Sequence, residues 1–343
     1  MKQENLRDTR KQDDEIQDSP QTCELPSLPI EKPQPTFLYD PPSYIRIQRS
    51  LNFMDFLMSM NKLCYDRYDP RYEHVTWEDL KVLDTSYGRH ISLEEGLQQP
   101  ELVSPRTKLR YTIERIFTQE DITHYWYRTF VICADFANLI PQFRELSIKD
   151  QCDLFKLNFF TFSWCINLEQ IVLNPEIRGY PMGNGSFGPW RSDDIAEFLK
   201  KYNFTPDAVY KPHQKAMEDY KDFIHKNMIT PVQELNLNEK EICLLKVMTL
   251  FQNEEHFIGN GKEICHNTTN FILDTLWDYQ LTEYPAMTFD EKLRRHSRFL
   301  LLLPKICQAW YMKSDMHLLM SMFGGTNIDG IPKELLFSSN TNA

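Results

Sequence analysis

The stretch from residue 125 to residue 156 restricts the fold more than any other part of this chain. Its first half repeats apolar side chains at intervals of three and four residues, the spacing that gives a helix one mostly apolar face. Pro141 disfavours helical geometry in the residue before it and therefore marks the end of that helix. Ser147, three residues before Asp150, can satisfy an exposed backbone donor and begin a second helix. The stretch thus predicts two helices joined by a short turn. The face of the first helix consists of Tyr125, Thr129, Ile132, Cys133, Phe136, Ala137 and Ile140.

Patterns along the rest of the chain predict one mainly helical domain. Residues 1–36 contain five prolines and no aromatic residue, so they cannot bury enough apolar surface to offset the entropy lost on ordering. We expect a disordered segment over 1–43, a folded domain over 44–337 and a tail over 338–343. Within the domain we expect a short helix over 93–98, longer helices over 45–63, 114–140, 148–172, 238–252, 263–283 and 288–312, and a loop over 174–190 with room for a short hairpin.

Two distant blocks add a specific order of residue types. The first block, residues 295–337, contains a leucine run that ends at Pro304. Near its end it has the pattern of two apolar residues, any residue, a glutamate and two further apolar residues. That closing pattern occupies Ile331 to Leu336, with Pro332 at its second apolar position. The second block is EICLLKVMTLF, at residues 241–251.

These blocks resemble the ligand-binding domain of nuclear hormone receptors. In the central stretch the family signature is matched by Phe136, Ala137, Phe143, Leu146, Asp150, Gln151, Leu154, Phe155 and Lys156. The resemblance implies an all-α fold, a three-layer antiparallel helical sandwich, with a hinge-like N-terminal segment. The long stretch before residue 114 and the turn region at 179–185 are most similar to the divergent nematode branch of the family.

Charge and cysteine spacing argue against DNA contact by this chain. Lysine and arginine number 38 against 49 aspartates and glutamates, and the net charge of −11 opposes non-specific attraction to nucleic acid. The eight cysteines form no CxxC pair, so they cannot build the two four-cysteine zinc sites of the family's DNA-binding domain. We expect no direct DNA contact and no metal site. The chain either belongs to a receptor that lacks this domain or is an isoform or fragment without it.

Other function classes receive little support. No apolar run approaches the roughly 20 residues that span a bilayer, and the N-terminus lacks an apolar signal region, so we expect an intracellular protein without a membrane segment. Gly183, Gly185 and Gly188 satisfy GxGxxG, but prolines flank the motif and no β-branched strand is apparent beside it. We therefore expect no nucleotide cofactor. Spacing nominates no nucleophile with a base and an orienting acid, which argues against an enzyme.

The resemblance implies a surface groove for an amphipathic LxxLL helix of a coregulator. In the family, a terminal-helix glutamate caps the N-terminus of that peptide and a lysine in the preceding long helix caps its C-terminus. Glu334 matches the glutamate, whereas the lysine position is Asn138. We expect the loss of this charge to weaken or alter the groove, because such a charge contributes about 0.3 to 1 kcal/mol. The predicted groove residues are Glu334, Lys156, Asn138, Ile331 and Leu335.

The resemblance also implies a pocket for a small lipophilic ligand. Gln170 stands where receptors for acidic lipids commonly have arginine, and an amide cannot hold a carboxylate in a bidentate ion pair. Tyr125 and Trp126 stand where many members have small residues, so we expect a narrow or self-filled cavity without preference for fatty-acid carboxylates. The predicted pocket residues are Tyr125, Trp126, Thr129, Phe159, Phe160, Ser163, Asn167, Gln170, Met316 and Met320.

Two functions follow from the resemblance. The first is a nuclear transcriptional regulator that binds a small apolar ligand, or acts without one, and recruits coregulators. The alternative is an interaction protein without a DNA-binding domain, which dimerises with itself or with another receptor and modulates it. Ligand, partner and direction of regulation do not follow from the sequence.

Overall fold

The computed structural model describes residues 43–74, 90–117, 119–189, 214–322, 330–331 and 334–335. By its internal contacts the chain divides into residues 1–41 and 42–343, and all described residues belong to the second unit. The predicted disordered segment, apart from Ser43, and the predicted tail lie outside the described residues, as does Pro332. Within the described residues no helix is both long and apolar enough to cross a membrane.

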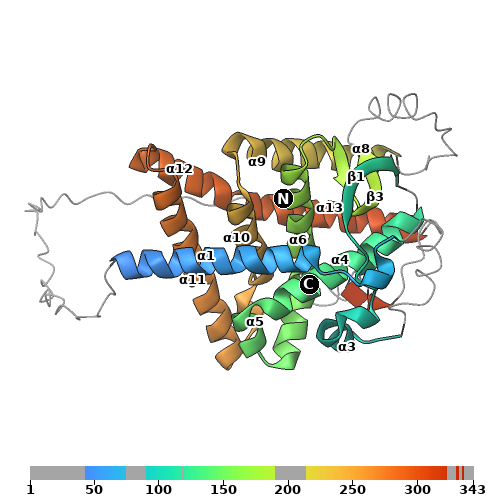
Figure 1. Ribbon diagram of the computed structural model, residues 1–343, viewed down its shortest axis with the longest axis horizontal. Helices are drawn as coiled ribbons and strands as arrows, with labels where there is room; N and C mark the ends of the chain where they lie inside the picture. Colours follow the sequence, from blue (N-terminus) through green and yellow to red (C-terminus); the bar gives the residue numbers. More distant parts are fainter. Residues whose placement is uncertain are drawn as a thin grey trace, which may run out of the picture. The chain divides into compact units, whose positions relative to one another are not determined.

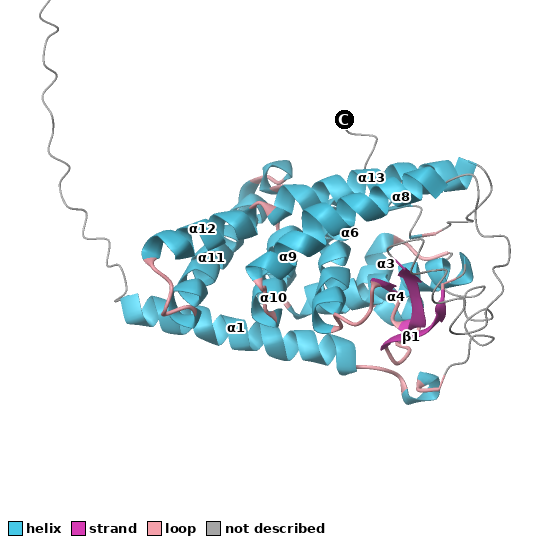
Figure 2. Cartoon of the chain, turned by 90° about the horizontal axis from the view of Figure 1, so that it is seen from above, coloured by secondary structure: helices cyan, strands magenta, loops and turns pink. Residues whose placement is uncertain are grey.

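Helices dominate the described part of the chain, which confirms the predicted all-α class (Figure 1). Helices α6 and α10 form the middle layer, with α1 on one side and α8, α9 and α13 on the other (Figure 2). The helices are α1 (Ser43–Asp66), α3 (Leu93–Gln98), α4 (Gln119–Leu139), α5 (Pro141–Glu145), α6 (Ile148–Leu173), α8 (Gln214–Ile224), α9 (Thr230–Leu235), α10 (Glu239–Leu250), α11 (Gly259–Glu283), α12 (Phe289–Leu300) and α13 (Leu302–Met322), with a π-helical turn at His225–Ile229 and 3-10 turns at Pro70–Tyr72, Pro100–Leu102 and Glu254–His256.

Local capping fixes where several of these helices begin. The Ser147 hydroxyl accepts a hydrogen bond from the Asp150 backbone at 3.1 Å, which confirms the predicted start of α6. Helices α10 and α12 begin with complete capping boxes, which pair Asn238 with Glu241 and Thr288 with Glu291. In each pair, the side chain of either residue accepts a hydrogen bond from the backbone N–H of the other. Each box satisfies amide donors that a helix start leaves without partners.

A small sheet corrects the sequence interpretation. The hairpin allowed for in 174–190 is present as β2 (Gly179–Pro181) and β3 (Asn184–Pro189), and a third strand, β1 (Arg110–Ile116), pairs with β3 in parallel. The predicted helix start at residue 114 was therefore wrong, because residues 110–116 give their backbone hydrogen bonds to β3. Gly183 and Gly185 adopt positive φ angles of 74° and 85°, which glycine tolerates without a Cβ clash, so these two glycines of the GxGxxG pattern allow the chain to turn between β2 and β3.

The single helix expected over 288–312 is in fact two helices. Helix α12 ends at Leu300 and α13 begins at Leu302. The break places Pro304 in the first turn of α13, where backbone N–H groups have no partner within the helix, so the missing N–H of proline costs no hydrogen bond.

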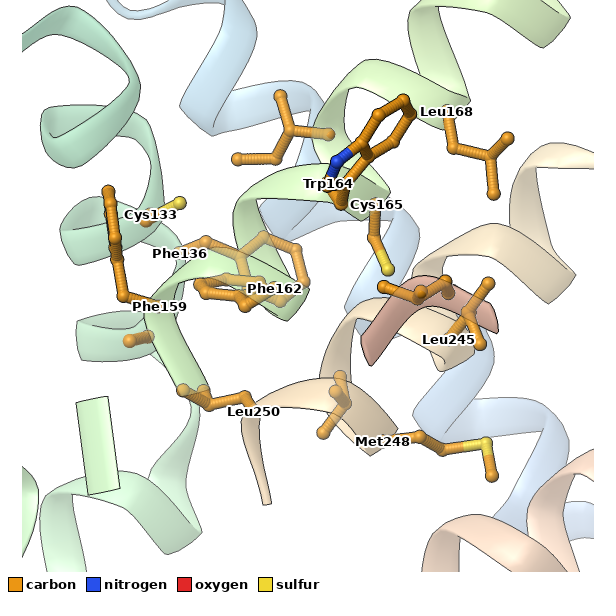
Figure 3. Close-up of a cluster of buried hydrophobic side chains, with 14 of the residues drawn as sticks. Cys133, Phe136, Phe159, Phe162, Trp164, Cys165, Leu168, Leu245, Met248 and Leu250 are labelled. Atoms are coloured by element: carbon orange, nitrogen blue, oxygen red, sulfur yellow. The ribbon is translucent and has the colours of Figure 1, made fainter. Parts of the chain in front are cut away.

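The apolar core lies between α4, α6 and α10. Phe136 of α4 meets Phe162 of α6 with ring centroids 5.7 Å apart, and Leu245 of α10 is fully buried. Figure 3 shows this cluster, which includes Cys133, Phe136, Phe159, Phe162, Trp164, Cys165, Leu168, Leu245, Met248 and Leu250.

A buried ion pair ties the middle layer to α1. Lys246 Nζ of α10 lies 2.5 Å from Glu169 Oε2 of α6, and the two side chains are 1% and 0% exposed. Asn61 of α1 completes the group, since its Nδ2 donates to Glu169 at 2.6 Å and its Oδ1 accepts from Lys246 at 2.7 Å. Because each charge has hydrogen-bonding partners, the pair tolerates burial that an isolated charge would not.

Candidate functional site

The described end of the chain packs against α3. Ile331 and Leu335 are buried at 0% and 1% exposure, whereas Glu334 is exposed. The Ile331 side chain lies against Gly96 of α3, where an added Cβ atom would come within 2.5 Å of Ile331 Cδ1. In Figure 1 the short red terminal piece is drawn beside α3 and α4. Three of the predicted groove residues thus lie on one terminal segment docked on the helical body.

Asn138, at the lysine position of the predicted groove, has a definite partner. Its Nδ2 donates a hydrogen bond of 2.7 Å to the backbone carbonyl of Leu97, the fifth residue of α3. Helix α3 packs on both α4 and α6. Asn138 is therefore joined to another part of the same domain. Lys156, on the third turn of α6, is half-buried.

Cys152 of α6 lies near both α3 and the terminal segment. Burial, together with the carboxylates of Glu94, Asp153 and Glu334, raises the pKa of its thiol to about 11. Glu94 belongs to α3 and Glu334 to the terminal segment. Because both act on Cys152, both acidic side chains lie near the first turns of α6. Helix α3, α6 and the terminal segment therefore meet at Cys152.

Aromatic rings pack together where the ligand pocket was predicted. Trp126 of α4 meets Phe160 of α6 edge-on, with centroids 5.2 Å apart, and lies 6.2 Å from Phe159. Phe160 stacks on Trp310 of α13 at 3.4 Å and 4°. These four residues contribute large rings to one contact, which supports the expectation of a narrow or self-filled cavity at this place.

A polar chain runs beside the aromatic rings. Tyr125 shares a hydrogen bond of 2.7 Å with Tyr180 of β2, and Asn167 Nδ2 donates to the Tyr125 hydroxyl at 2.5 Å. Asn167 also donates to the Ser163 carbonyl at 3.0 Å. Burial raises the pKa values of both tyrosines, so their hydroxyls stay neutral and act as hydrogen-bonding groups. Thr129 is buried on the same helix as Tyr125.

Gln170 faces a different space. It lines a cavity of about 540 Å³ between α1, β1, α6 and α10, together with Asn61, Tyr65 and Tyr111. Of the described side chains predicted for the pocket, Gln170 alone lines this cavity. Met316 and Met320 lie on α13, but their side chains are outside the described ones. The structure therefore brings together the aromatic and polar residues of α4 and α6 and directs Gln170 away from them.

Sequence reasoning missed three contributors to these regions. Tyr180 and Trp310 complete the polar chain and the aromatic contact, and α3 supplies the partner of Asn138. The helix itself was predicted over 93–98, and what the sequence did not indicate is its contact with Asn138. Tyr180 gave none, because its role depends on strand pairing. Among the described residues no group of three or more His, Cys, Asp or Glu is placed to hold a metal ion.

His124 makes the stability of the fold depend on pH. Its ring is buried, and burial, with Arg128 nearby, lowers its pKa to about 4. The ordinary value is about 6.5, so between these values the unfolded chain binds more protons and stability is lost as the pH falls. We expect the free energy of unfolding to drop by about 1.5 kcal/mol from this residue between pH 6.5 and pH 5. Urea titrations across this range measure it.

The matched comparison is between two histidine variants. His124→Gln should lack this part of the pH dependence, whereas His256→Gln, at an exposed position, should keep the wild-type slope. An unchanged slope in His124→Gln would contradict the assignment.

Comparison with known proteins gives a consistent family. A sequence description of the ligand-binding domain of nuclear hormone receptors matches residues 110–323. Two similar proteins of Caenorhabditis elegans are nuclear hormone receptor family member nhr-4, 21% identical over 239 residues, and nuclear hormone receptor family member nhr-61, 26% identical over 216 residues. These matches cover 70% and 62% of this chain but 45% and 48% of the relatives. The chain thus spans less than half the length of either.

Proposed function

The chain belongs to the nuclear hormone receptor family through its ligand-binding domain, and from this premise we propose that it regulates transcription in the nucleus by recruiting coregulators. The proposal assigns an LxxLL-type helix to the region formed by the end of α4, the start of α6 and the terminal segment. The observation that carries it is the docked terminal segment, in which Ile331 and Leu335 are buried while Glu334 is exposed beside α6. A buried apolar side and an exposed glutamate are the two features that helix-in-groove recognition requires of this segment.

The ligand in this proposal is small and mostly apolar. We assign its binding site to the aromatic contact of Trp126, Phe159 and Phe160. The polar groups of this site are Tyr125, Asn167 and Ser163. Ligand pockets combine apolar walls with a few polar groups that orient the ligand. Gln170 faces another cavity and carries no charge, which supports a ligand without a carboxylate. The proposed function is non-enzymatic.

Binding of a fluorescent LxxLL peptide to the full 343-residue chain tests the groove. We expect saturable binding that Glu334→Gln weakens about two- to fivefold, because the glutamate interacts with the positive end of the peptide helix dipole. Fluorescence anisotropy measures the affinity. Glu255→Gln removes the same charge at an exposed position outside this region and should bind like wild type. Equal affinity of the two variants would contradict the proposed role of Glu334.

A second candidate function is dimerisation with another receptor or with a second copy of this chain. Helices α12 and α13, with Leu301 between them, leave four large apolar side chains exposed, and exposed apolar side chains that form one surface favour a protein partner. The four are Phe289, Leu293, Leu301 and Tyr311. A chain that sediments as a dimer and binds no LxxLL peptide would favour this function over coregulator recruitment.

A further inference from the structure

We propose that helix α3 is an internal occupant of the coregulator groove, which a coregulator helix must displace before it can bind. This inference rests on the proposed function, because it takes the region around Asn138 and the terminal segment to be that groove. It assigns to residues 92–99 a regulatory role: while α3 is docked, the groove is closed by the receptor's own chain.

The sequence of α3 is that of an altered LxxLL helix. Residues 93–97 read LEEGL, so leucines stand at the first and fifth positions of the motif and glycine at the fourth. Leu93 and Leu97 are 4% and 2% exposed, while Glu94 and Glu95 face solvent. The helix therefore presents to the body of the domain the same face that an LxxLL peptide presents to its groove.

The end of α3 meets Asn138 as a peptide end would. Asn138 stands where the resemblance places a lysine that caps the C-terminus of the coregulator helix, and its amide donates to the carbonyl of Leu97 at 2.7 Å. A helix leaves its last carbonyls without partners inside the helix, so a donor at this point stabilises the docked end. A neutral amide is sufficient for a segment that is already covalently attached.

Gly96 explains the departure from the motif. A Cβ atom at this position would lie 2.5 Å from Ile331 Cδ1 and 2.9 Å from Val103 Cγ2. A leucine here would collide with the terminal segment in its present position, whereas glycine allows α3 and Ile331 to touch. The residue that breaks the LxxLL pattern is thus the one that contacts the terminal segment.

The short length of α3 makes the occupation reversible. Helix α3 has six residues, and a helix this short does not persist alone in water, so it is held by its contacts with α4 and α6.

The test compares peptide affinity in variants of the full chain. In Leu93→Ser/Leu97→Ser, α3 loses both buried leucines, and we expect the fluorescent LxxLL peptide to bind at least about tenfold more tightly than to wild type, a change of about 1.4 kcal/mol. Gln98→Ser, on the exposed face of α3, is the matched control and should bind like wild type. Adding Glu334→Gln to the double variant should weaken the gained binding.

The outcomes separate the two proposals. If wild type and the double variant bind equally and both respond to Glu334→Gln, α3 does not occupy the groove, while coregulator recruitment stands. If no form binds the peptide, both proposals are overturned. Should the double variant not fold, Leu97→Ala serves as the milder variant, with at least threefold tighter binding expected.

Hydrogen exchange of the wild-type chain gives an independent measurement. Saturating LxxLL peptide should release the protection of amides 93–99 and leave that of α1 unchanged. Undiminished protection of α3 in the peptide complex would overturn the inference.

Discussion

Lys246→Met is expected to lower the free energy of unfolding by about 3–5 kcal/mol, because it leaves the carboxylate of Glu169 buried without its counter-charge. Glu169 is fully buried, and its remaining partners include the amide of Asn61 and the hydroxyl of Tyr65, neither of which carries a positive charge. The loss is a large fraction of the total stability of a typical domain. Urea unfolding followed by circular dichroism at pH 7 measures it.

Two variants control for this result. Lys240→Met makes the same change on the same helix, where the lysine lies 3.3 Å from the exposed Asp55, and should cost less than about 1 kcal/mol. Lys246→Met combined with Glu169→Gln removes both charges and should recover much of the loss. A double variant less stable than Lys246→Met would mean that the ion pair is not what the methionine disrupts.

The sequence predicted those features of the fold that depend on neighbouring residues. Pro141 and Ser147 predicted the end of α4 and the start of α6 because proline geometry and capping act within a few residues. Strand β1 was missed because its partner, β3, lies about 70 residues away and only this pairing satisfies its backbone. The burial of Lys246 was not predicted, because it depends on Glu169, which is 77 residues distant in the sequence.

The candidate site shows the same division. The family resemblance placed Asn138 and Glu334 in one predicted groove, but it could not indicate that α3 would lie against Asn138. Helical spacing placed Gln170 on the same helix as Asn167, but which neighbour each side chain faces depends on packing between layers. Gln170 turned out to face α1 and β1.

Phe160→Ala is expected to cost about 3–5 kcal/mol of unfolding free energy and to open an apolar cavity at the predicted ligand site. The ring is 5% exposed and is enclosed by Trp126, Phe159 and Trp310. Removing it leaves these rings without a neighbour, and a cavity with apolar walls can take up a small apolar molecule. Benzene should therefore raise the melting temperature of the variant more than that of wild type, as measured by thermal unfolding.

Phe289→Ala is the matched control, because it removes the same ring at a position that is 63% exposed on α12. It should cost at most about 1 kcal/mol and create no benzene response. Stabilisation by a ligand requires that the folded state binds it and the unfolded state does not, so the benzene response reports a cavity in the folded protein. If wild type and Phe160→Ala respond equally, space for a ligand already exists beside these rings, and the self-filled description of the site is wrong. A response confined to Phe160→Ala would mean that the Phe160 ring fills this space in the wild-type protein.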